Sequence, residues 1–415
     1  MRILWIVNIE FPEALELLKI DSEFTSSGGW LLAAAEALSN NDSIRLFVAS
    51  ASSHVKQLTR LEGKRIIYYL VPSGHESRKY NKTFEYYWKE IKKREKPNVI
   101  HIHGTEFPYG LSYLIACGNQ HTLVTLQGIS NAISKYYTAG LSNWDIIKYI
   151  TFRDLFGRTI WHEKGKFTKQ GLLENEILKR CNHIVGRTAF DRAYVHIINP
   201  EAQYYVCNET LREDFYIGQW ERNRCTPNTI FLSQAWYPLK GAHQVFKAMP
   251  FILERYPNAK IRIAGYNILK TDTIQQRLRL TGYANYLRSL IKSLHIEDKI
   301  EFIGPLTAGG IKRELLSCNV FVCPSSIENS SNSLAEAQIL GVPCVASYVG
   351  GLPSIMKGDE THLYRFEDIE MLAYLVSDIF DGNFNSNMRD VAIKRHDPSV
   401  NLERLMEIYN IVHNE

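Results

Sequence analysis

The segment Val320–Pro353, VFVCPSSIENSSNSLAEAQILGVPCVASYVGGLP, alternates the signals of a strand, a polar loop, a helix and a second strand. Its apolar, β-branched start, Val320–Cys323, predicts a buried strand. After the polar loop, Leu334–Leu340 predicts a helix and Pro343–Ser347 predicts the second strand. Strands joined through helices in this way build parallel sheets that helices cover on both faces.

The same alternation extends along the whole chain of 415 residues. Further strands are predicted at Arg2–Val7, Ile44–Ala49, Arg65–Val71, Val99–Ile102, Thr122–Leu126, His183–Val185 and Gln203–Val206, then at Thr229–Leu232, Lys260–Ala264 and Ile300–Ile303. The polar, irregular segment Glu213–Asn228 separates the two series. We therefore expect an α/β protein of two doubly wound, Rossmann-like domains, residues 1–218 and 219–399, that face each other across a cleft. Residues 400–415 are expected to form a helix that packs back on the first domain.

The composition is that of an ordinary globular protein. Hydrophobic residues make up 45% of the chain, and the net charge of +4 is too small to indicate nucleic-acid binding. The seven cysteines are odd in number and form no C-x-x-C pair, which indicates reduced thiols rather than a disulfide framework. The apolar start Met1–Asn8 is too short for a signal peptide, and no apolar run reaches the roughly 18 residues that cross a bilayer. We therefore expect a cytoplasmic protein that binds no nucleic acid.

The loop before the predicted helix Leu334–Leu340 has the features of an anion site. Ser331, Asn332 and Ser333 lie at the N-terminus of that helix, where backbone N–H groups and the helix dipole favour a diphosphate. Glu328 and Glu336 flank the loop, and carboxylates in these positions suit ribose or sugar hydroxyls. A second interpretation stays open, because Ser333–Glu336 also fits the S-x-x-E pattern of a capping box.

The segment resembles the signature of glycosyltransferase family 4 (glycosyl transferases group 1), whose members are retaining, nucleotide-sugar-dependent enzymes of the GT-B fold. The family pattern is E-x7-E with EA, then G-x-P and GG-x-P, and it is matched by Glu328, Glu336–Ala337, Gly341–Pro343 and Gly350–Pro353. The resemblance implies that Glu336 holds the ribose hydroxyls and that Glu328 contacts the donor sugar near the reaction centre. The family's usual Gly-Phe-Gly is replaced here by Asn329–Asn332.

Two further segments resemble phosphate-binding parts of this family. Gly28 and Gly29 follow the first strand and open a helix, as the family's N-terminal GG loop does. Lys240, followed by a glycine, resembles the lysine of the family's diphosphate clamp. The clamp arginine has no counterpart in Ser233–Trp236, so we expect Arg187, at the end of a strand in the first domain, to supply the missing charge.

His103 and Gln127 end two consecutive predicted strands, in the segments VIHIHG and TLQG. Both resemble family positions that line the cleft, and Gln127 stands where many members carry a histidine. We therefore add His103 and Gln127 to Glu328 and Lys240 as candidate catalytic residues. A purely structural role for a histidine within a strand is the alternative.

The resemblance implies a glycosyltransferase of the hexosyl type that moves a sugar from a nucleotide-diphosphate-sugar donor to an acceptor hydroxyl, with retention. Lys240 and the backbone of Ser331–Ser333 would stabilise the leaving diphosphate. The sequence contains no D-x-D pair, so we expect neither a metal ion nor another cofactor. A saccharide or lipid-linked saccharide in bacterial surface polysaccharide or glycan assembly is the expected acceptor. A nucleotide-sugar epimerase of the same fold and a catalytically weak nucleotide-sugar binding protein remain alternatives.

Residues 79–96 suggest contact with a membrane. This basic, aromatic-rich stretch would place Tyr80, Phe84, Tyr87 and Ile91 near one face of a helix with lysines around them. Such a helix can lie on an anionic membrane surface, which would place the protein on the inner face of the membrane. Packing of the same face on the sheet is the alternative. The stretch Lys135–Arg180 is also basic and rich in aromatic residues.

Overall fold

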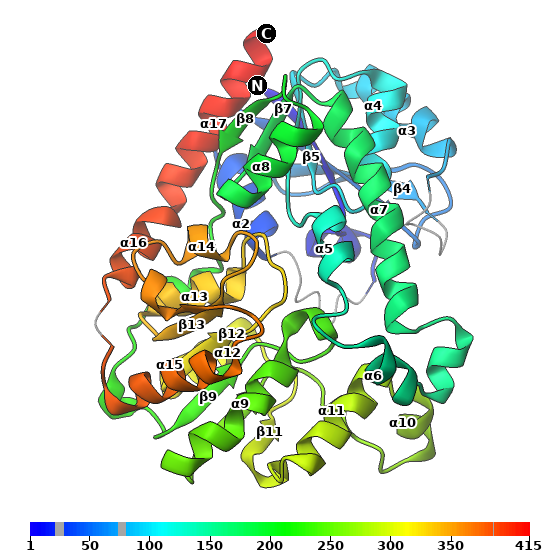
Figure 1. The fold of residues 1–415 in the computed structure, drawn as a ribbon. Coiled ribbons are helices and arrows are strands. Elements are labelled where there is room, and N and C mark those ends of the chain that lie inside the picture. The colour runs from blue at the N-terminus through cyan, green and yellow to red at the C-terminus, as the bar shows by residue number, and fades with distance from the viewer. Residues whose placement is uncertain (21–28, 74–79, 385) are drawn as a thin grey trace. The chain divides into compact units, whose positions relative to one another are not determined.

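A computed structural model describes residues 1–20, 29–73, 80–384 and 386–415, which form two compact units (Figure 1). The first unit comprises Met1–Asn131, Thr168–Leu211 and His396–Glu415. The second comprises Ala132–Phe167 and Arg212–Arg395. Each unit contains its own sheet and its own hydrophobic core.

The first unit is built on an eight-stranded sheet with the order β3-β4-β2-β1-β5-β6-β7-β8. Its strands are β1 (Arg2–Val7), β2 (Arg45–Ser52), β3 (Thr59–Glu62), β4 (Ile66–Pro72), β5 (Val99–His103), β6 (Thr122–Thr125), β7 (His183–Gly186) and β8 (Gln203–Val206). All neighbours pair in parallel except β3, which pairs antiparallel with β4 at the edge. The strand β3 was not predicted, because it is short and half-exposed and so has no apolar run.

Helices cover both faces of this sheet, as the alternation within β1 requires. On one face Ile3, Trp5 and Val7 pack against α2 (Gly29–Ser39) and α17 (Pro398–Asn414). On the other face Leu4 and Ile6 pack against α3 (Thr83–Glu95), α4 (Tyr109–Cys117) and α7 (Ile160–Arg180). The remaining helices are α1 (Pro12–Leu17) and α8 (Ala189–Ile198), while α5 (Ser130–Tyr136) begins in this unit and continues into the second.

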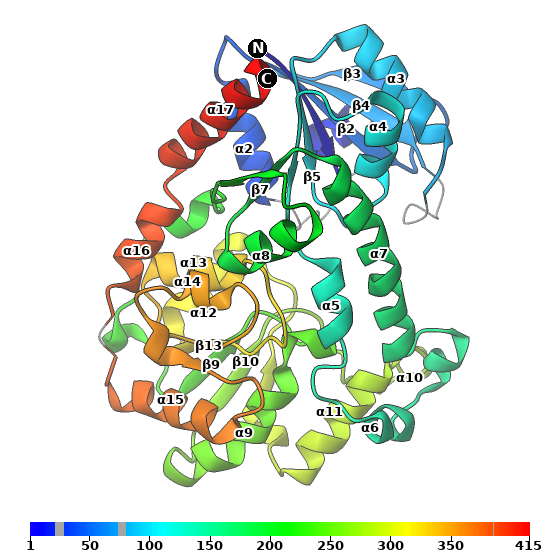
Figure 2. The ribbon, with the colours of Figure 1, turned by 45° about the horizontal axis from the view of Figure 1, so that its top comes forward.

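The C-terminal helix α17 is anchored to the sheet by a buried tyrosine. The Tyr409 hydroxyl accepts a hydrogen bond from Trp5 Nε1 at 2.9 Å and lies 2.7 Å from Nδ1 of His101 on β5. The helix therefore lies against the first unit, and both ends of the chain meet beside its sheet (Figures 1 and 2).

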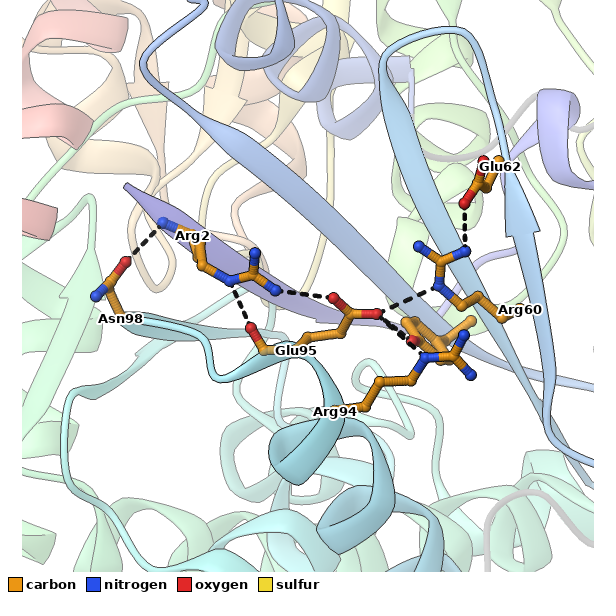
Figure 3. Close-up of polar contacts among 7 residues, drawn as sticks. Arg2, Arg60, Glu62, Arg94, Glu95 and Asn98 are labelled. Atoms are coloured by element: carbon orange, nitrogen blue, oxygen red, sulfur yellow. Dashed lines mark hydrogen bonds and ion pairs between the residues drawn. The ribbon is translucent and has the colours of Figure 1, made fainter.

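A buried carboxylate, Glu95, ties the end of α3 to three strands (Figure 3). Its Oε2 pairs with Arg2 at 2.9 Å, and its Oε1 pairs with Arg60 at 3.2 Å and accepts a hydrogen bond from the Tyr69 hydroxyl. Burial would raise the pKa of Glu95, but the hydrogen bonds and the arginine charges outweigh burial and lower it. The carboxylate thus stays ionised and joins β1, β3 and β4 to α3.

The apolar face of α3 is not available to a membrane. Phe84 and Ile91 are buried in the core, and Tyr80 and Tyr87 are half-buried against it. The alternative of packing on the sheet therefore holds for this face of residues 80–95. In the described parts of the chain, no helix is long and apolar enough to cross a bilayer.

The second unit is built on a six-stranded parallel sheet with the order β11-β10-β9-β12-β13-β14. Its strands are β9 (Thr229–Leu232), β10 (Lys260–Ile263), β11 (Ile300–Phe302), β12 (Val320–Cys323), β13 (Cys344–Ser347) and the unpredicted, two-residue β14 (Leu363–Tyr364). Its α-helices are α6 (Asn143–Lys148), α9 (Ala242–Arg255), α10 (Ile274–Arg279), α11 (Gly282–Ser293), α12 (Ala308–Ser317), α13 (Asn332–Leu340), α14 (Leu352–Ile355), α15 (Ile369–Asp381) and α16 (Met388–Arg395). Separate apolar cores on the two faces of the sheet bury α9, α11 and α15 on one side and α12, α13 and α14 on the other.

The segment Ala132–Phe167 lies in the second unit, whereas the sequence placed it in the first domain. It is held there by polar contacts. The Thr151 hydroxyl donates to the carbonyl of Leu280 at 2.7 Å, and Tyr149 donates to Ser289 on α11 at 2.9 Å. Contacts between residues so far apart in the sequence cannot be predicted from local sequence patterns.

Candidate active site

Three loops meet at the carboxyl ends of β9, β12 and β13 in the second unit. Lys240 ends the short 3₁₀ helix η4 (Pro238–Lys240) after β9. Glu328 lies in the loop after β12, and Gly350–Gly351 follow β13. Neighbouring parallel strands end at the same edge of a sheet, which is where ligands bind in such sheets.

Lys240 and Glu328 form a largely buried ion pair. The Lys240 ammonium contacts Glu328 Oε1, and the Ser325 hydroxyl donates to the same oxygen at 2.8 Å. Burial alone would lower the pKa of Lys240, but the charge and hydrogen bond of Glu328, together with Tyr237 and Cys323, outweigh burial and raise it. Lys240 is therefore a fixed positive charge beside the loop that follows β12.

Two glycines permit this close approach of loops. Gly241 has φ +67°, and a Cβ there would overlap the carbonyl oxygen of Pro324. Gly350 has φ +51°, and a Cβ there would overlap the carbonyl oxygen of Glu328. The same carbonyl accepts a hydrogen bond from the Gly351 N–H at 2.9 Å. Gly350 and Gly351 thus hold the backbone of Glu328 in place.

The helix α13 begins at this loop. Its N-cap is Ser331, whose hydroxyl accepts from the Leu334 N–H at 3.4 Å. Asn332 and Ser333 occupy its half-buried first turn, which carries no acidic residue. Within the described chain, Oδ1 of Asn332 is buried without a hydrogen-bond partner. The positive end of the helix dipole and an unused acceptor therefore lie beside Glu328.

Glu336 pairs with an arginine that the sequence gave no reason to select. Arg212 donates through Nε and Nη2 to the two carboxylate oxygens of Glu336, at 2.7 Å each. Glu336 is 3% exposed, and burial raises its pKa while the Arg212 hydrogen bond and charge oppose the rise. The capping-box interpretation of Ser333–Glu336 is wrong, because Ser331 caps the helix and the Glu336 carboxylate is used by Arg212. Arg212 is 124 positions from Glu336, so no local motif could join them.

In the first unit, His103 and Gln127 follow one another along the carboxyl edge of the sheet, at the ends of β5 and β6. His103 is buried between the rings of His101 and Trp5, with ring-centroid distances of 3.7 and 4.3 Å. Burial, and then the neighbouring His101, lower its pKa well below the ordinary value. Neither of its ring nitrogens has a hydrogen-bond partner within the described residues. His103 is therefore a neutral imidazole with hydrogen-bonding capacity to spare.

Arg187 lies at the end of β7, but its charge is already used. Its buried guanidinium forms an ion pair with Glu209 and donates to the carbonyls of Leu126 at 2.8 Å and Gln127 at 3.3 Å. The expected contact of Arg187 with a diphosphate therefore stays a prediction. It would require the Arg187–Glu209 ion pair to open. Gly29 begins α2, and Gly28 lies outside the described residues.

Two carboxylates at the same edge, the buried Glu174 and the half-buried Glu106, were missed in the sequence. Glu174 on α7 accepts from the Thr105 hydroxyl at 2.8 Å and from the Ser130 N–H at 3.0 Å, and burial raises its pKa to about 7. Glu106 accepts from the Gly128 N–H at 3.0 Å, and burial raises its pKa too. Single glutamates in a loop and in a helix are ordinary surface residues by sequence, so only tertiary structure could single them out.

The family described as glycosyl transferases group 1 matches residues 219–396. An uncharacterized glycosyltransferase of Methanocaldococcus jannaschii is 34% identical over 137 residues, which are 33% of this chain and 31% of that protein. The chain spans between about a third and about a half of the length of the first curated relatives that it matches.

Solved structures match over nearly the whole chain. Sucrose-phosphate synthase from Thermosynechococcus elongatus has a TM-score of 0.65 at 16% identity, covering 99% of this chain and 96% of that one. The Anabaena protein HepE, solved in complex with UDP, has a TM-score of 0.64 at 13% identity, covering 98% and 99%. The chain therefore carries, over residues 219–396, the domain of the glycosyl transferases group 1, a family of transferase enzymes, and its fold is of the GT-B type.

Proposed function

We propose that the chain transfers a sugar from a nucleotide-diphosphate-sugar donor to an acceptor hydroxyl, with retention of the anomeric configuration. The observation that carries the proposal is the largely buried Lys240–Glu328 pair beside the N-terminus of α13. It joins a fixed cation, a carboxylate and a helix dipole at the carboxyl edge of a parallel sheet. The solved complex of HepE with UDP supports a nucleotide ligand for this fold.

In this proposal Lys240 and α13 stabilise the leaving diphosphate. The ammonium group has three N–H donors, so Lys240 can keep its contact with Glu328 while it donates to a phosphate oxygen. Ser331, Asn332 and Ser333 direct the start of α13 at the same phosphate. Because charge accumulates on the diphosphate as the glycosidic bond breaks, these groups contribute most in the transition state. The mechanism as proposed requires no metal ion or other cofactor.

Glu328 and Glu336 take the hydroxyl groups of the donor. Each carboxylate oxygen can accept two hydrogen bonds, so the Arg212 pair leaves Glu336 with capacity for the ribose hydroxyls. Glu328 has the same spare capacity for the sugar hydroxyls, and Asn332 adds an acceptor that no described residue uses. Arg212 therefore acts as a positioning residue that holds Glu336 ionised and in one orientation.

We assign the acceptor to the first unit, where His103, Gln127 and Glu106 end neighbouring strands or follow them. A neutral imidazole that has no hydrogen-bond partner among the described residues and a half-buried carboxylate suit sugar hydroxyls better than an acceptor phosphate. A saccharide or a lipid-linked saccharide in bacterial surface glycan assembly fits this chemistry. The protein would act at the cytoplasmic side, where nucleotide sugars are used.

A thermal-shift panel of UDP, GDP, ADP, CDP and TDP, with and without magnesium, tests donor binding. A nucleotide at 100 times its Kd should add about 2.7 kcal/mol of stability, or roughly 2–4 °C for each kcal/mol. We expect one nucleotide to shift wild type and the control Glu301→Ala, which alters an exposed carboxylate on β11, but not Glu336→Ala. A shift of equal size in Glu336→Ala would refute the ribose role.

Measurements of turnover distinguish the proposed transferase from an epimerase and from a nucleotide-sugar binding protein. A transferase should form product only when an acceptor is present, and the anomeric proton coupling of that product reports retention. Interconversion of the donor sugar without acceptor would instead favour an epimerase. Donor binding without product from a saccharide acceptor panel would favour a binding protein.

A further inference from the structure

A band of large apolar side chains lies exposed on the second unit. Trp144, Leu155 and Phe156 are 70%, 72% and 71% exposed. Other exposed members of this band are Ile147, Ile150, Phe152 and Trp161, with Ile274 and Leu278 on α10. We call these nine residues the α6–α10 surface. Monomeric proteins seldom leave so many large apolar side chains together in water without a functional reason.

Specific contacts hold these residues next to one another. The rings of Phe152 and Phe156, on the 3₁₀ helix η1 (Phe152–Phe156), lie 5.1 Å apart. Arg153 Nη1 donates to the carbonyl of Arg279 at 3.1 Å, which ties η1 to the end of α10. Trp161 Nε1 donates to Asn143 at 3.3 Å, which ties α7 to α6. Both views show α6 beside α10 (Figures 1 and 2).

The core-facing side of α6 already packs in the hydrophobic core of the second unit. Ile146 packs in the core that contains Leu287 and Ile291 of α11. Trp144 and Ile147 on the other side of α6 are exposed, so this short helix is apolar on both sides. Core packing therefore does not explain the outward residues, and they require a partner that accepts apolar side chains.

The charges around the α6–α10 surface are mainly positive. Its exposed basic residues are Lys148, Arg158, Lys270, Arg277 and Arg279. Among nearby acidic residues, Asp154 is buried and accepts from the Thr151 N–H at 2.9 Å, and Glu163 pairs with Lys166. Asp145 on α6 accepts from the Ser142 N–H and hydroxyl. Asp272 is the exposed acid beside α10. An apolar surface ringed by basic residues complements a structure whose negatively charged outer layer covers a hydrocarbon interior.

We propose that the α6–α10 surface binds the face of an anionic lipid bilayer. Tryptophan and phenylalanine favour the boundary between headgroups and acyl chains, and long basic side chains reach from there to lipid phosphates. A second copy of the chain is a poorer partner, because a two-fold contact would bring the same basic residues of both copies together. The proposal does not depend on the donor site, and it replaces residues 79–96 as the membrane-facing element.

Co-sedimentation of the full chain with phosphatidylcholine vesicles, with and without phosphatidylglycerol, tests the proposal. We expect binding to the anionic vesicles at low salt and weaker binding as salt rises. Leu155→Ser/Phe156→Ser should weaken binding at least tenfold, whereas the control Ile197→Ser, which alters an 82% exposed residue on α8, should leave it unchanged. Arg277→Gln/Arg279→Gln should reduce the preference for anionic over neutral vesicles. Because all these side chains are exposed, melting temperatures should stay at the wild-type value.

Three outcomes would overturn the proposal. The first is no binding of wild type to anionic vesicles at low salt, and the second is equal binding by Leu155→Ser/Phe156→Ser. The third is a wild-type dimer in solution that this double variant converts to a monomer, without vesicle binding by either. In that case the α6–α10 surface is a contact between copies of the chain.

Discussion

Removal of Arg212 should leave a buried carboxylate without its counter-ion. Glu336 keeps 5% of its side chain exposed, whereas Arg212 keeps 29%. Removing one partner of a fully enclosed pair costs roughly 3–5 kcal/mol. Because Arg212 reaches solvent in the folded protein, we expect Arg212→Ala to cost less, about 2–3 kcal/mol. That cost corresponds to a fall of about 4–12 °C in melting temperature.

A double-mutant cycle isolates the pair from other effects of the Arg212 side chain. Glu336→Gln removes the buried charge but keeps an acceptor for Arg212, so it should cost about 1 kcal/mol. Arg212→Ala/Glu336→Gln should cost less than the sum of the single variants by about 1–2 kcal/mol, because no unpaired charge is then buried. Chemical denaturation of the four proteins measures these differences.

The pH dependence of the Arg212→Ala deficit supplies an independent check. The pKa of Glu336 is raised above 4.5 by burial, and without Arg212 it should rise further. A carboxyl group with a raised folded-state pKa favours folding below its unfolded pKa, and this contribution is lost as pH rises through the folded pKa. The deficit should therefore be small below pH 4.5 and grow toward neutral pH. A deficit that is constant with pH, and equally large in the Glu336→Gln background, would refute this reasoning.

Three more changes should have distinct signatures. Gly241→Ala should cost more than Gly304→Ala in a denaturant titration, because both have positive φ but only Gly241 faces a backbone carbonyl. Glu95→Gln should cost about 2–3 kcal/mol of stability at pH 7. The cost should shrink as pH falls below 4.5, because a carboxylate with a lowered folded-state pKa stabilises the fold only while it is ionised. A cost that grows in acid would contradict this. Glu328→Gln should tighten binding of a free nucleoside diphosphate in calorimetry while it lowers turnover.

The sequence was most informative where burial is continuous. The strands Arg2–Val7, Thr229–Leu232 and Val320–Cys323 were predicted with the bounds observed, because each is an uninterrupted apolar run between polar segments. The strand β3 and the helix α7 were missed, since the first is half-exposed and the second mixes polar and apolar residues along its length. Propensity alone does not identify such elements.

The residues of the candidate site were likewise predicted only in part. The loops after β9, β12 and β13 were located from linear motifs, because each motif lies in one short segment. Arg212, Glu106 and Glu174 were not located from the sequence. They matter to the site through burial and through contacts with residues far away in the chain. The sequence could not decide for α3 between a membrane-facing helix and packing on the sheet, and the structure shows the packing. An amphipathic helix has the same pattern whether a sheet or a lipid surface covers it.

The prediction for Glu328 follows from the charges that the site holds before any donor binds. In the proposed site Lys240 is a cation for the diphosphate, and Glu328 already contacts it. A diphosphate must therefore share Lys240 with a carboxylate, and it must also approach that like charge. Glu328→Gln removes the repulsion and frees Lys240 while it keeps the shape of the side chain, so the free nucleotide should bind more tightly. Turnover should still fall, because a neutral amide interacts less with the positive charge that develops on the sugar in the transition state. Weaker nucleotide binding by Glu328→Gln would show that Glu328 serves the diphosphate by orienting Lys240, and not the sugar.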